Sequence, residues 1–307
     1  EFELRDYSIK RERIGLALNL DYRPGNNNEY YLRSLYSRFS DTETRQGMIV
    51  ELADAQFAGN SGGAELIRSL KQREETQSIS ALVIGTKQIS GSWEWLLEAG
   101  ASKADEDTPF NIGAEDFEQE FDDGVGFTGS NILRLTAPAE ALLADGYELK
   151  EVEMGDTYAK ETERNIKFDL SREIIQRHGS VLLKSGAKFS QREKSAAEDV
   201  WLFEDFADLG ISALSLADYA GGSVDYSLST MGPAISSGSI YQLVNSLNRD
   251  DFIDEVESQI NDYQVDEDIS AAYLMAQWER DNWQLIGGVR FEHEQRDASG
   301  SRYDAID

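Results

Sequence analysis

The chain has 307 residues, 58 acidic side chains against 29 basic ones, and a net charge of −29. Nucleic acid is not an expected partner, because phosphate binding needs a basic face. There is no cysteine, which excludes disulfides and thiolate metal sites, and two histidines, His178 and His293, leave little for histidine-based catalysis or zinc.

Hydropathy excludes a membrane helix, because no run of about 18 apolar residues occurs. The mean hydropathy is −0.50 and 40% of the residues are hydrophobic. A transmembrane β-barrel gives such soluble-looking values, since only alternate strand residues face lipid. The chain starts without Met or a signal peptide and stops just past a strand-like stretch, so we expect a fragment of a longer protein.

Strict alternation predicts the first strand over residues 14–22. Apolar residues from Ile14 to Tyr22 alternate with Gly, Ala, Asn and Asp. This period of two is typical of a strand between an apolar and a polar medium. The Pro24–Asn28 stretch has the chemistry of a turn, and a second strand is expected over residues 30–39.

A long hairpin follows, with a glycine-rich apex at Gly59–Gly63. Its return arm ends in an apolar stretch, Ile79–Ile89. A membrane strand needs about ten residues, and both arms are much longer. We therefore expect this hairpin to project well beyond a membrane on one side.

The middle of the chain combines a strand with an acidic stretch. A tight turn at Ser90–Ser92 precedes an alternating strand over Trp93–Ala101. The Asp- and Glu-rich residues 105–129 show no amphipathic helix and predict a long loop. Clustered carboxylates are Ca²⁺ ligands, but the spacing is not that of an ordered calcium loop, so we expect a solvated loop.

Two further strands are predicted over residues 151–170 and 181–189, joined by a turn at Ser171–Gly179. A long irregular part follows, roughly from Ala197 to Asp266. Within it, residues 239–256 have apolar side chains at helical spacing, broken by a polar interruption. We expect this piece to be a loop helix packed on the rest of the fold, and not a partner-binding helix.

The last predicted element is a hairpin of two alternating strands, Ser270–Trp278 and Trp283–His293. A short polar connection, residues 279–282, joins them, so they should pair antiparallel. Trp278 and Trp283 flank this turn. Tryptophans at the turn end of alternating strands are typical of the interfacial aromatic belt of a membrane barrel.

Tight turns and long connections alternate along the chain. The tight turns are expected near Pro24, Gly91, Arg172 and Asp281, and three long excursions separate them. Outer-membrane barrels have this asymmetry, with short periplasmic turns and long extracellular loops. The sequence therefore predicts an all-β fold: about eight strands of a larger antiparallel transmembrane barrel.

No residue pattern predicts catalysis, a cofactor site or a metal site, and no ligand-binding residue is identified. His293 lies between two glutamates and is expected to be a lumen or loop residue. Charged residues on the polar faces of the predicted strands are expected to line a polar lumen. They are Asp21, Arg23, Lys167, Asp169, Lys184, Lys188 and Arg290.

The closing hairpin resembles a known family. Ser270–Glu279 followed by Asn282–Glu292 is similar to the paired barrel strands of TonB-dependent outer-membrane receptors, in which a strand of the form AAYxQxxxE precedes xLxxGVRYE. Ile14–Arg38 and Thr157–Lys194 resemble the same family, in particular its large proteobacterial subgroup that includes carbohydrate-associated receptors.

The resemblance implies a barrel of about 22 strands closed by an N-terminal plug, with energy delivered from the inner membrane through a TonB box. Residues 1–307 would then be a partial barrel domain, without the plug and the barrel C-terminus. No family ligand-binding residue transfers to this sequence, because those residues lie in variable loops and in the plug.

The function expected from this resemblance is active import of a scarce ligand, a siderophore, cobalamin or a carbohydrate, across the outer membrane of a Gram-negative bacterium. The expected partners are outer-membrane lipid, the small-molecule ligand, the protein's own plug and the TonB complex, and no bond chemistry is expected. A passive porin-like barrel and a soluble β-rich adhesion or binding module are the alternatives. The soluble module would bury its alternating faces in a protein core and would not collect Trp at tight turns.

Overall fold

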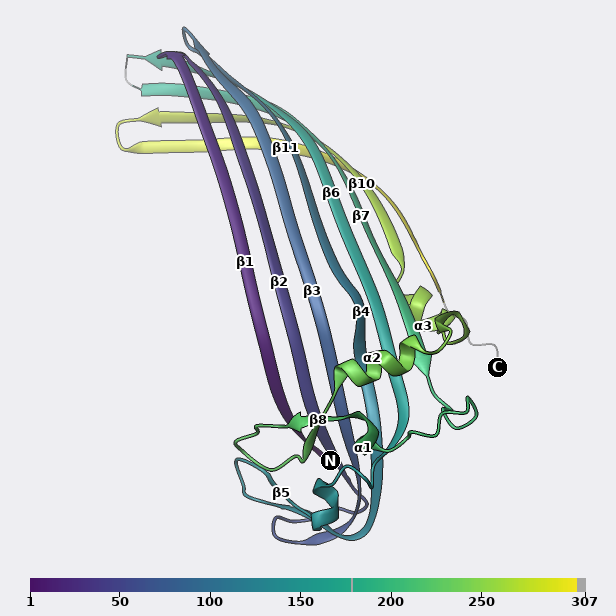
Figure 1. The fold of residues 1–307 in the computed structure, drawn as a ribbon. Helices are drawn as coiled ribbons and strands as arrows, with labels where there is room; N and C mark the ends of the chain where they lie inside the picture. The colour runs from purple at the N-terminus through teal and green to yellow at the C-terminus, as the bar shows by residue number, and fades with distance from the viewer. Residues whose placement is uncertain (178, 303–307) are drawn as a thin grey trace.

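Long antiparallel strands make up most of the fold. The computed structural model describes residues 1–177 and 179–302. Its main sheet follows the path β1-β2-β3-β4-β6-β7-β10-β11, so the long strands pair in chain order. Figure 1 shows this sheet as a curved wall whose path ends at β1 and β11. The predicted all-β antiparallel fold is confirmed.

The long strands have 18 to 36 residues, whereas a membrane-crossing strand needs about 9–11. Their bounds are β1 Phe2–Gly25, β2 Asn28–Leu52, β3 Ser61–Ser90, β4 Trp93–Thr128, β6 Glu148–Gln176, β7 Gly179–Phe203, β10 Tyr263–Arg280 and β11 Trp283–Gly300.

Short elements lie in the long connections. Strand β5 pairs with the end of β4, and β8 pairs with β9 in a separate two-stranded sheet. The bounds are β5 Arg134–Thr136, η1 Ala139–Leu142, α1 Leu216–Tyr219, β8 Ala220–Ser223, β9 Pro233–Ile235, α2 Ser237–Asn245, η2 Arg249–Asp251 and α3 Glu255–Ile260.

The connections are sorted by length between the two ends of the sheet. Two-residue turns join β1 to β2, β3 to β4 and β10 to β11, and β6 and β7 meet at the same end. The connections 53–60, 129–147 and 204–262 all lie at the opposite end, the lower end in Figure 1. The predicted alternation of tight turns and long excursions is confirmed, as are the turns around residues 24–28 and 90–92.

The acidic stretch is not a loop, contrary to the prediction. Residues 105–128 belong to β4, which pairs with β3 on one side and with β6 on the other. Register shifts around Thr108 and Ile112 accommodate the irregular sequence within the ladder. Backbone pairing to two neighbours therefore sets the conformation here, although the side-chain pattern lacks the alternation of a half-buried strand.

Three predicted boundaries in the second half are also wrong. Strand β6 continues to Gln176, past its predicted end at Leu170, so the connection to β7 occupies only the last part of the predicted turn Ser171–Gly179. His178 lies outside the described residues. The irregular part is confined to residues 204–262, because β7 and β10 extend into the range expected to be loop. The expected single helix is two pieces, α2 and α3, because Ser236 and Asp254 each begin a new helix by accepting backbone N–H bonds.

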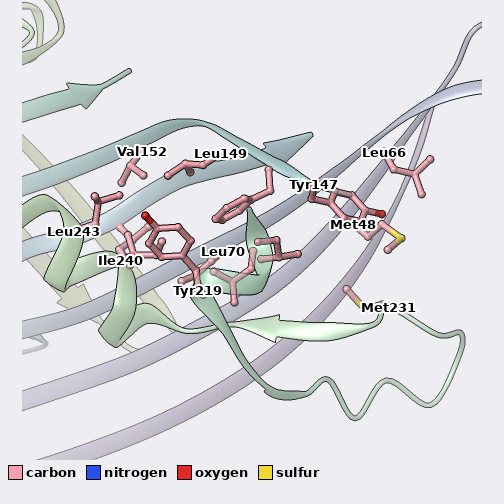
Figure 2. Packing of buried hydrophobic residues seen from close by; sticks show 14 of the residues in the cluster. Met48, Leu66, Leu70, Tyr147, Leu149, Val152, Tyr219, Met231, Ile240 and Leu243 are labelled. Carbon is pink, nitrogen blue, oxygen red and sulfur yellow. The ribbon is translucent and has the colours of Figure 1, made fainter. Parts of the chain in front are cut away.

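The long connections fold back onto the strands and form a hydrophobic core at this end. Ile240, Leu243 and Val244 of α2 have helical spacing and are buried. They belong to one cluster with strand residues such as Met48 and Leu66. Figure 2 shows Ile240 and Leu243 near Val152 of β6 and Leu149, so the expected packing of the loop helix on the rest of the fold is confirmed.

Hydrogen bonds fix the 204–262 connection across several strands. The Gln46 side chain of β2 donates to the Ile235 carbonyl at 3.0 Å and accepts from the Ile235 N–H at 2.8 Å. Arg68 of β3 donates to the Pro233 carbonyl at 2.5 Å. The Tyr241 hydroxyl of α2 donates to the Phe110 carbonyl of β4 at 3.0 Å. This connection therefore lies across the sheet, as Figure 1 shows for α2.

Candidate functional site

The strand register sorts the side chains of the sheet into two faces. Residues directly opposite each other in an antiparallel pair point to the same face. One row of paired residues crosses all eight long strands and is largely apolar. It runs Leu20, Leu32, Ile84, Ala99, Ile166, Phe189, Ser270 and His293.

Neighbouring rows on this face extend it into a surface that we call the apolar band. On β1 it runs from Ile14 to Tyr22 and on β11 from Trp283 to Phe291. The band comprises the alternating, mostly apolar residues of this face within 14–22, 30–36, 82–86, 93–101, 166–174, 181–189, 270–278 and 283–291.

Many of the large apolar side chains in the apolar band are exposed. Leu16 is 67% exposed and Phe291 is 73% exposed. Farther along the same face, beyond polar residues such as Thr42, Met48 and Leu66 are completely buried under the chain's own connections. The chain thus covers this face at one end and leaves it bare in the band. An exposed apolar surface of this extent marks an interaction site for a membrane, a protein partner or a ligand.

Aromatic residues of the band gather at its tight-turn edge. Tyr22 and Tyr30 stack with ring centroids 6.2 Å apart, and the Arg172 guanidinium lies 4.9 Å from the Trp93 ring centroid. Trp278 and Trp283 flank the last turn. The predicted collection of tryptophans beside the tight turns is therefore confirmed.

The opposite face, which we call the polar face, carries all seven residues predicted to line a lumen. Alternation and register place there Asp21, Arg23, Lys167, Asp169, Lys184, Lys188 and Arg290. His293 is the exception among the predicted polar residues. It lies two positions from Phe291 and pairs with Ser270, which puts it at the edge of the apolar band. Its expected position in a lumen or loop is therefore wrong.

Ion pairs and hydrogen bonds connect neighbouring strands along the polar face. Arg33 pairs with Asp21 at 2.5 Å between β2 and β1. Glu267 of β10 joins Arg192 of β7 at 3.4 Å to Arg296 of β11 at 2.6 Å. Most of these groups are partly exposed, so each contact alone contributes little to stability. Together, these contacts neutralise charges on neighbouring strands and connect the strands along the polar face.

Two places on the polar face share a Tyr–Gly–carboxylate arrangement over three strands. Tyr273 pairs with Gly186, which pairs with Asp169, and the Tyr273 hydroxyl donates to Asp169 at 2.7 Å. Tyr31, Gly85 and Glu98 repeat this arrangement with a hydroxyl-to-carboxylate distance of 2.7 Å. In both cases the tyrosine ring occupies the space where a glycine side chain would be. The glycines therefore permit a bond that spans three strands.

Substitution at Gly186 tests this arrangement. A Cβ there would lie 2.3 Å from an Asp169 oxygen and 2.5 Å from the Tyr273 ring. We expect Gly186→Ala to destabilise the folded protein by about 1–3 kcal/mol, the usual effect of overpacking, as measured by denaturant titration. Gly287→Ala is the matched control, since nothing lies within 4 Å of its Cβ position. Equal stability of the two variants would contradict the proposed role of the glycine.

The polar face becomes strongly acidic at the long-connection end. Burial, followed by repulsion from Glu198 and Glu257, raises the pKa of Glu153 above its ordinary value. The pKa of Glu65 is raised in the same way, by burial and then by Glu118 and Glu120. Within the part of the chain that the structure describes, no group of three or more His, Cys, Asp or Glu side chains is placed to hold a metal ion.

The raised pKa of Glu153 predicts a pH dependence. The folded state binds this proton more tightly than the unfolded chain, so the stabilisation is complete below the ordinary pKa of 4.5 and is lost as pH rises through the raised value. Glu153→Gln should increase hydrogen-exchange protection of the long-connection end at neutral pH and change little at acidic pH. The exposed Glu140, which does not contribute to the raised pKa of Glu65 or Glu153, offers the control substitution, Glu140→Gln. Reduced protection of the Glu153 variant at neutral pH would disprove the assignment.

Arg68 is a functional candidate that sequence reasoning missed. It lies between Leu66 and Leu70 on the buried part of the apolar face and is fully buried. Burial lowers its pKa to about 10, and its Nε and Nη1 have no partner among the described residues. Among the described residues, its one side-chain hydrogen bond goes to the Pro233 carbonyl, so its clearest role is to fix the 204–262 connection. A single arginine in an apolar stretch gave no signal for this position.

Comparisons with known proteins do not assign this chain to a family. No protein-family model matches it, and no curated protein is significantly similar to it. Within the described residues, no helix has the length and apolar character needed to span a membrane.

Proposed function

We propose that residues 1–307 form part of the wall of a transmembrane β-barrel in the outer membrane of a Gram-negative bacterium. The observation that carries this proposal is the apolar band, which is aligned across eight strands and left bare by a chain that buries the same face elsewhere. Lipid is the occupant that suits such a surface, because it covers apolar side chains without a shaped protein partner.

The dimensions of the band support a bilayer crossing. On β1 the band extends from Ile14 to Tyr22 and on β4 from Trp93 to Ala101. Each stretch matches the about 9–11 residues of a tilted membrane strand. Aromatic residues at the tight-turn edge would lie at one interface. In this proposal the tight turns are periplasmic and the long connections extracellular.

The proposal that this barrel belongs to an active importer rests on the sequence of the closing hairpin. Residues 270–292 resemble the paired strands of TonB-dependent receptors, and the strands project far beyond the band, as expected of a receptor with a large extracellular part. We propose active import of a scarce ligand, a siderophore, cobalamin or a carbohydrate, with the plug and the TonB complex as partners. Substrate would be caught at the extracellular end and released inward when the plug moves, without bond chemistry.

The acidic polar face at the long-connection end constrains the charge of the ligand. Buried or crowded carboxylates such as Glu65, Asp116 and Glu153 would repel a free polyanion at the entrance. A neutral or cationic ligand, or an anion whose charge is masked by a bound metal, fits this surface better.

Two alternatives share part of this reasoning. A passive porin-like barrel would have the same band but no plug, and its strands need not project so far beyond the bilayer. A soluble β-rich adhesion or binding module would have to cover the apolar band with protein. The chain's own connections cover only the long-connection end of that face, which favours a transmembrane barrel over a soluble module.

Substitution of band residues by arginine tests the membrane proposal. Leu18→Arg, in the middle of the band on β1, should cost about 2–4 kcal/mol of folding stability in bilayers. Leu285→Arg should cost less, because Leu285 lies beside Trp283 near the edge of the band. Gln284→Arg, on the polar face at the same depth, is the matched control. Unaltered stability of the Leu18 and Leu285 variants would rule out a lipid-facing band.

Uptake by cells that express the full-length protein tests the import proposal. Accumulation of labelled ferric siderophore, cobalamin or oligosaccharide should depend on the protein and should stop when the proton gradient of the inner membrane is collapsed. Uptake that survives collapse of the gradient would favour the passive pore. A protein that is recovered from the soluble fraction would instead favour the adhesion or binding module.

A further inference from the structure

A depression lies on the polar face, between the level of the apolar band and the long-connection end. It has a volume of about 330 Å³ and crosses β3, β4, β6, β7 and β10. Two neighbouring rows of the strand register supply its side chains. The first row includes Gln77, Glu106, Ala159 and Tyr263, and the second includes Ile79, Ala104, Glu161 and Lys194. Side chains from five strands therefore meet in this one depression.

Two alanines form the floor of this depression, and two carboxylates stand beside them. Glu106 of β4 pairs with Ala159 of β6. Ala104 pairs with Glu161 between the same two strands. The alanines therefore lie on one diagonal of this four-residue group and the carboxylates on the other. The hollow between the carboxylates is apolar and has a hydrogen-bond acceptor on each side.

Both carboxylates are held in position and still have an oxygen to offer. One Glu106 oxygen accepts a hydrogen bond from the Gln77 amide at 2.8 Å. One Glu161 oxygen lies 3.4 Å from the Arg192 guanidinium, outside the depression. The second oxygen of each carboxylate has no partner among the described residues. A hydroxyl group of a ligand can therefore donate to Glu106 or Glu161 without displacing an existing contact.

The side of the depression over β7 and β10 carries a cation and an aromatic ring. The Lys194 ammonium lies 5.7 Å from the Tyr263 ring centroid. Within the part of the chain that the structure describes, neither this ammonium nor the Tyr263 hydroxyl has a hydrogen-bond or ion-pair partner. Both groups can therefore donate to a ligand. The partly exposed ring of Tyr263 adds apolar surface beside the alanines.

The charges around the depression restrict the ligand that fits it. Lys194 would repel a cation, and Glu106 and Glu161 would repel an anion. A purely apolar ligand would cover these charged groups and remove their hydrogen bonds to water, which costs free energy. A neutral ring that carries its own hydroxyl groups avoids these costs. Its hydroxyls can donate to the carboxylates and accept from Lys194, while its apolar face lies on the alanine floor.

We propose that this depression binds a mono- or disaccharide unit of a neutral carbohydrate. The inference rests on the proposed import function and specifies the ligand class and the residues that hold it. Hydroxyls of the sugar bond to Glu106, Glu161 and Lys194. The apolar face of a sugar ring covers Ala159 and packs against Tyr263. The volume of about 330 Å³ lies at the lower end of the range of small-molecule sites, which suits a ligand unit of this size.

Calorimetric titration of the full-length protein with neutral saccharides tests the site. The probes are a panel of di- and trisaccharides that includes maltose, cellobiose and xylobiose, and we expect at least one of them to bind. Tyr263→Ala should weaken that binding by about tenfold, because the ring surface that the sugar covers is lost. Tyr263→Phe keeps the ring and should retain most of the affinity. A panel without any binding saccharide would overturn the proposal.

Filling the floor of the depression is an independent test. Ala159→Leu should weaken saccharide binding strongly, because its side chain occupies the hollow between the carboxylates. Ala17→Leu is the matched control, since Ala17 is exposed on the polar face of β1 and lies outside the depression. Equal losses in the two variants would overturn the site. Tighter binding of an amino sugar or a uronic acid than of the neutral sugar would assign the depression to a charged ligand and would also overturn it.

The outcomes distinguish this inference from the proposal on which it rests. Gradient-dependent uptake of a siderophore or cobalamin, without binding of any saccharide, refutes the saccharide site and leaves active import standing. A protein that is recovered from the soluble fraction and binds a saccharide through Tyr263 refutes the importer and leaves the site standing. A soluble protein that binds no saccharide refutes both proposals.

Discussion

The structure depends on one constraint, the backbone register of the antiparallel ladder, which has no shift along the apolar band. From β1 to β2 the pairing runs without a shift from Phe2 opposite Val50 to Tyr22 opposite Tyr30. Because side chains alternate between faces at every residue, one slipped residue would move Leu16 and Leu18 to the polar face and Asp21 to the apolar one. The two-residue turns fix this register at one end. Every functional surface of the molecule follows from the alternation that they keep in phase across eight strands.

The apolar face is used in two different ways along the same strands. Near the tight turns it is bare, and near the long connections it supports a core that includes Met48, Leu66 and Ile240. Polar residues such as Thr42 and Thr44 separate the two regions on β2. A protein that needed only a soluble core would cover both. The division is understandable if one region faces an apolar solvent and the other stands in water.

Some parts of the fold could be predicted from the sequence and others could not. Period-two patterning predicted the strands around Ile14–Tyr22 and Trp283–Phe291 and placed the seven charged residues on the polar face, because one face of each strand is bare and apolar. The sorting of turns was predicted from the alternation of short and long connections. The continuation of β4 through Asp105–Thr128 was not readable, because its conformation is set by pairing to β3 and β6 and not by its own side chains. The packing of Arg68 and the attachment of Gln46 to Ile235 also depend on residues about 165 and 189 positions away.

The 204–262 connection has a mechanical consequence. It leaves the sheet from β7 and returns through β10, yet it is bonded to Gln46 on β2, Arg68 on β3 and Phe110 on β4. It therefore acts as a tie across strands that are not neighbours. Flattening or widening of the sheet at this end would separate these strands and lengthen those bonds. The curvature of this end is therefore held by contacts that cross the sheet as well as by the twist of its strands.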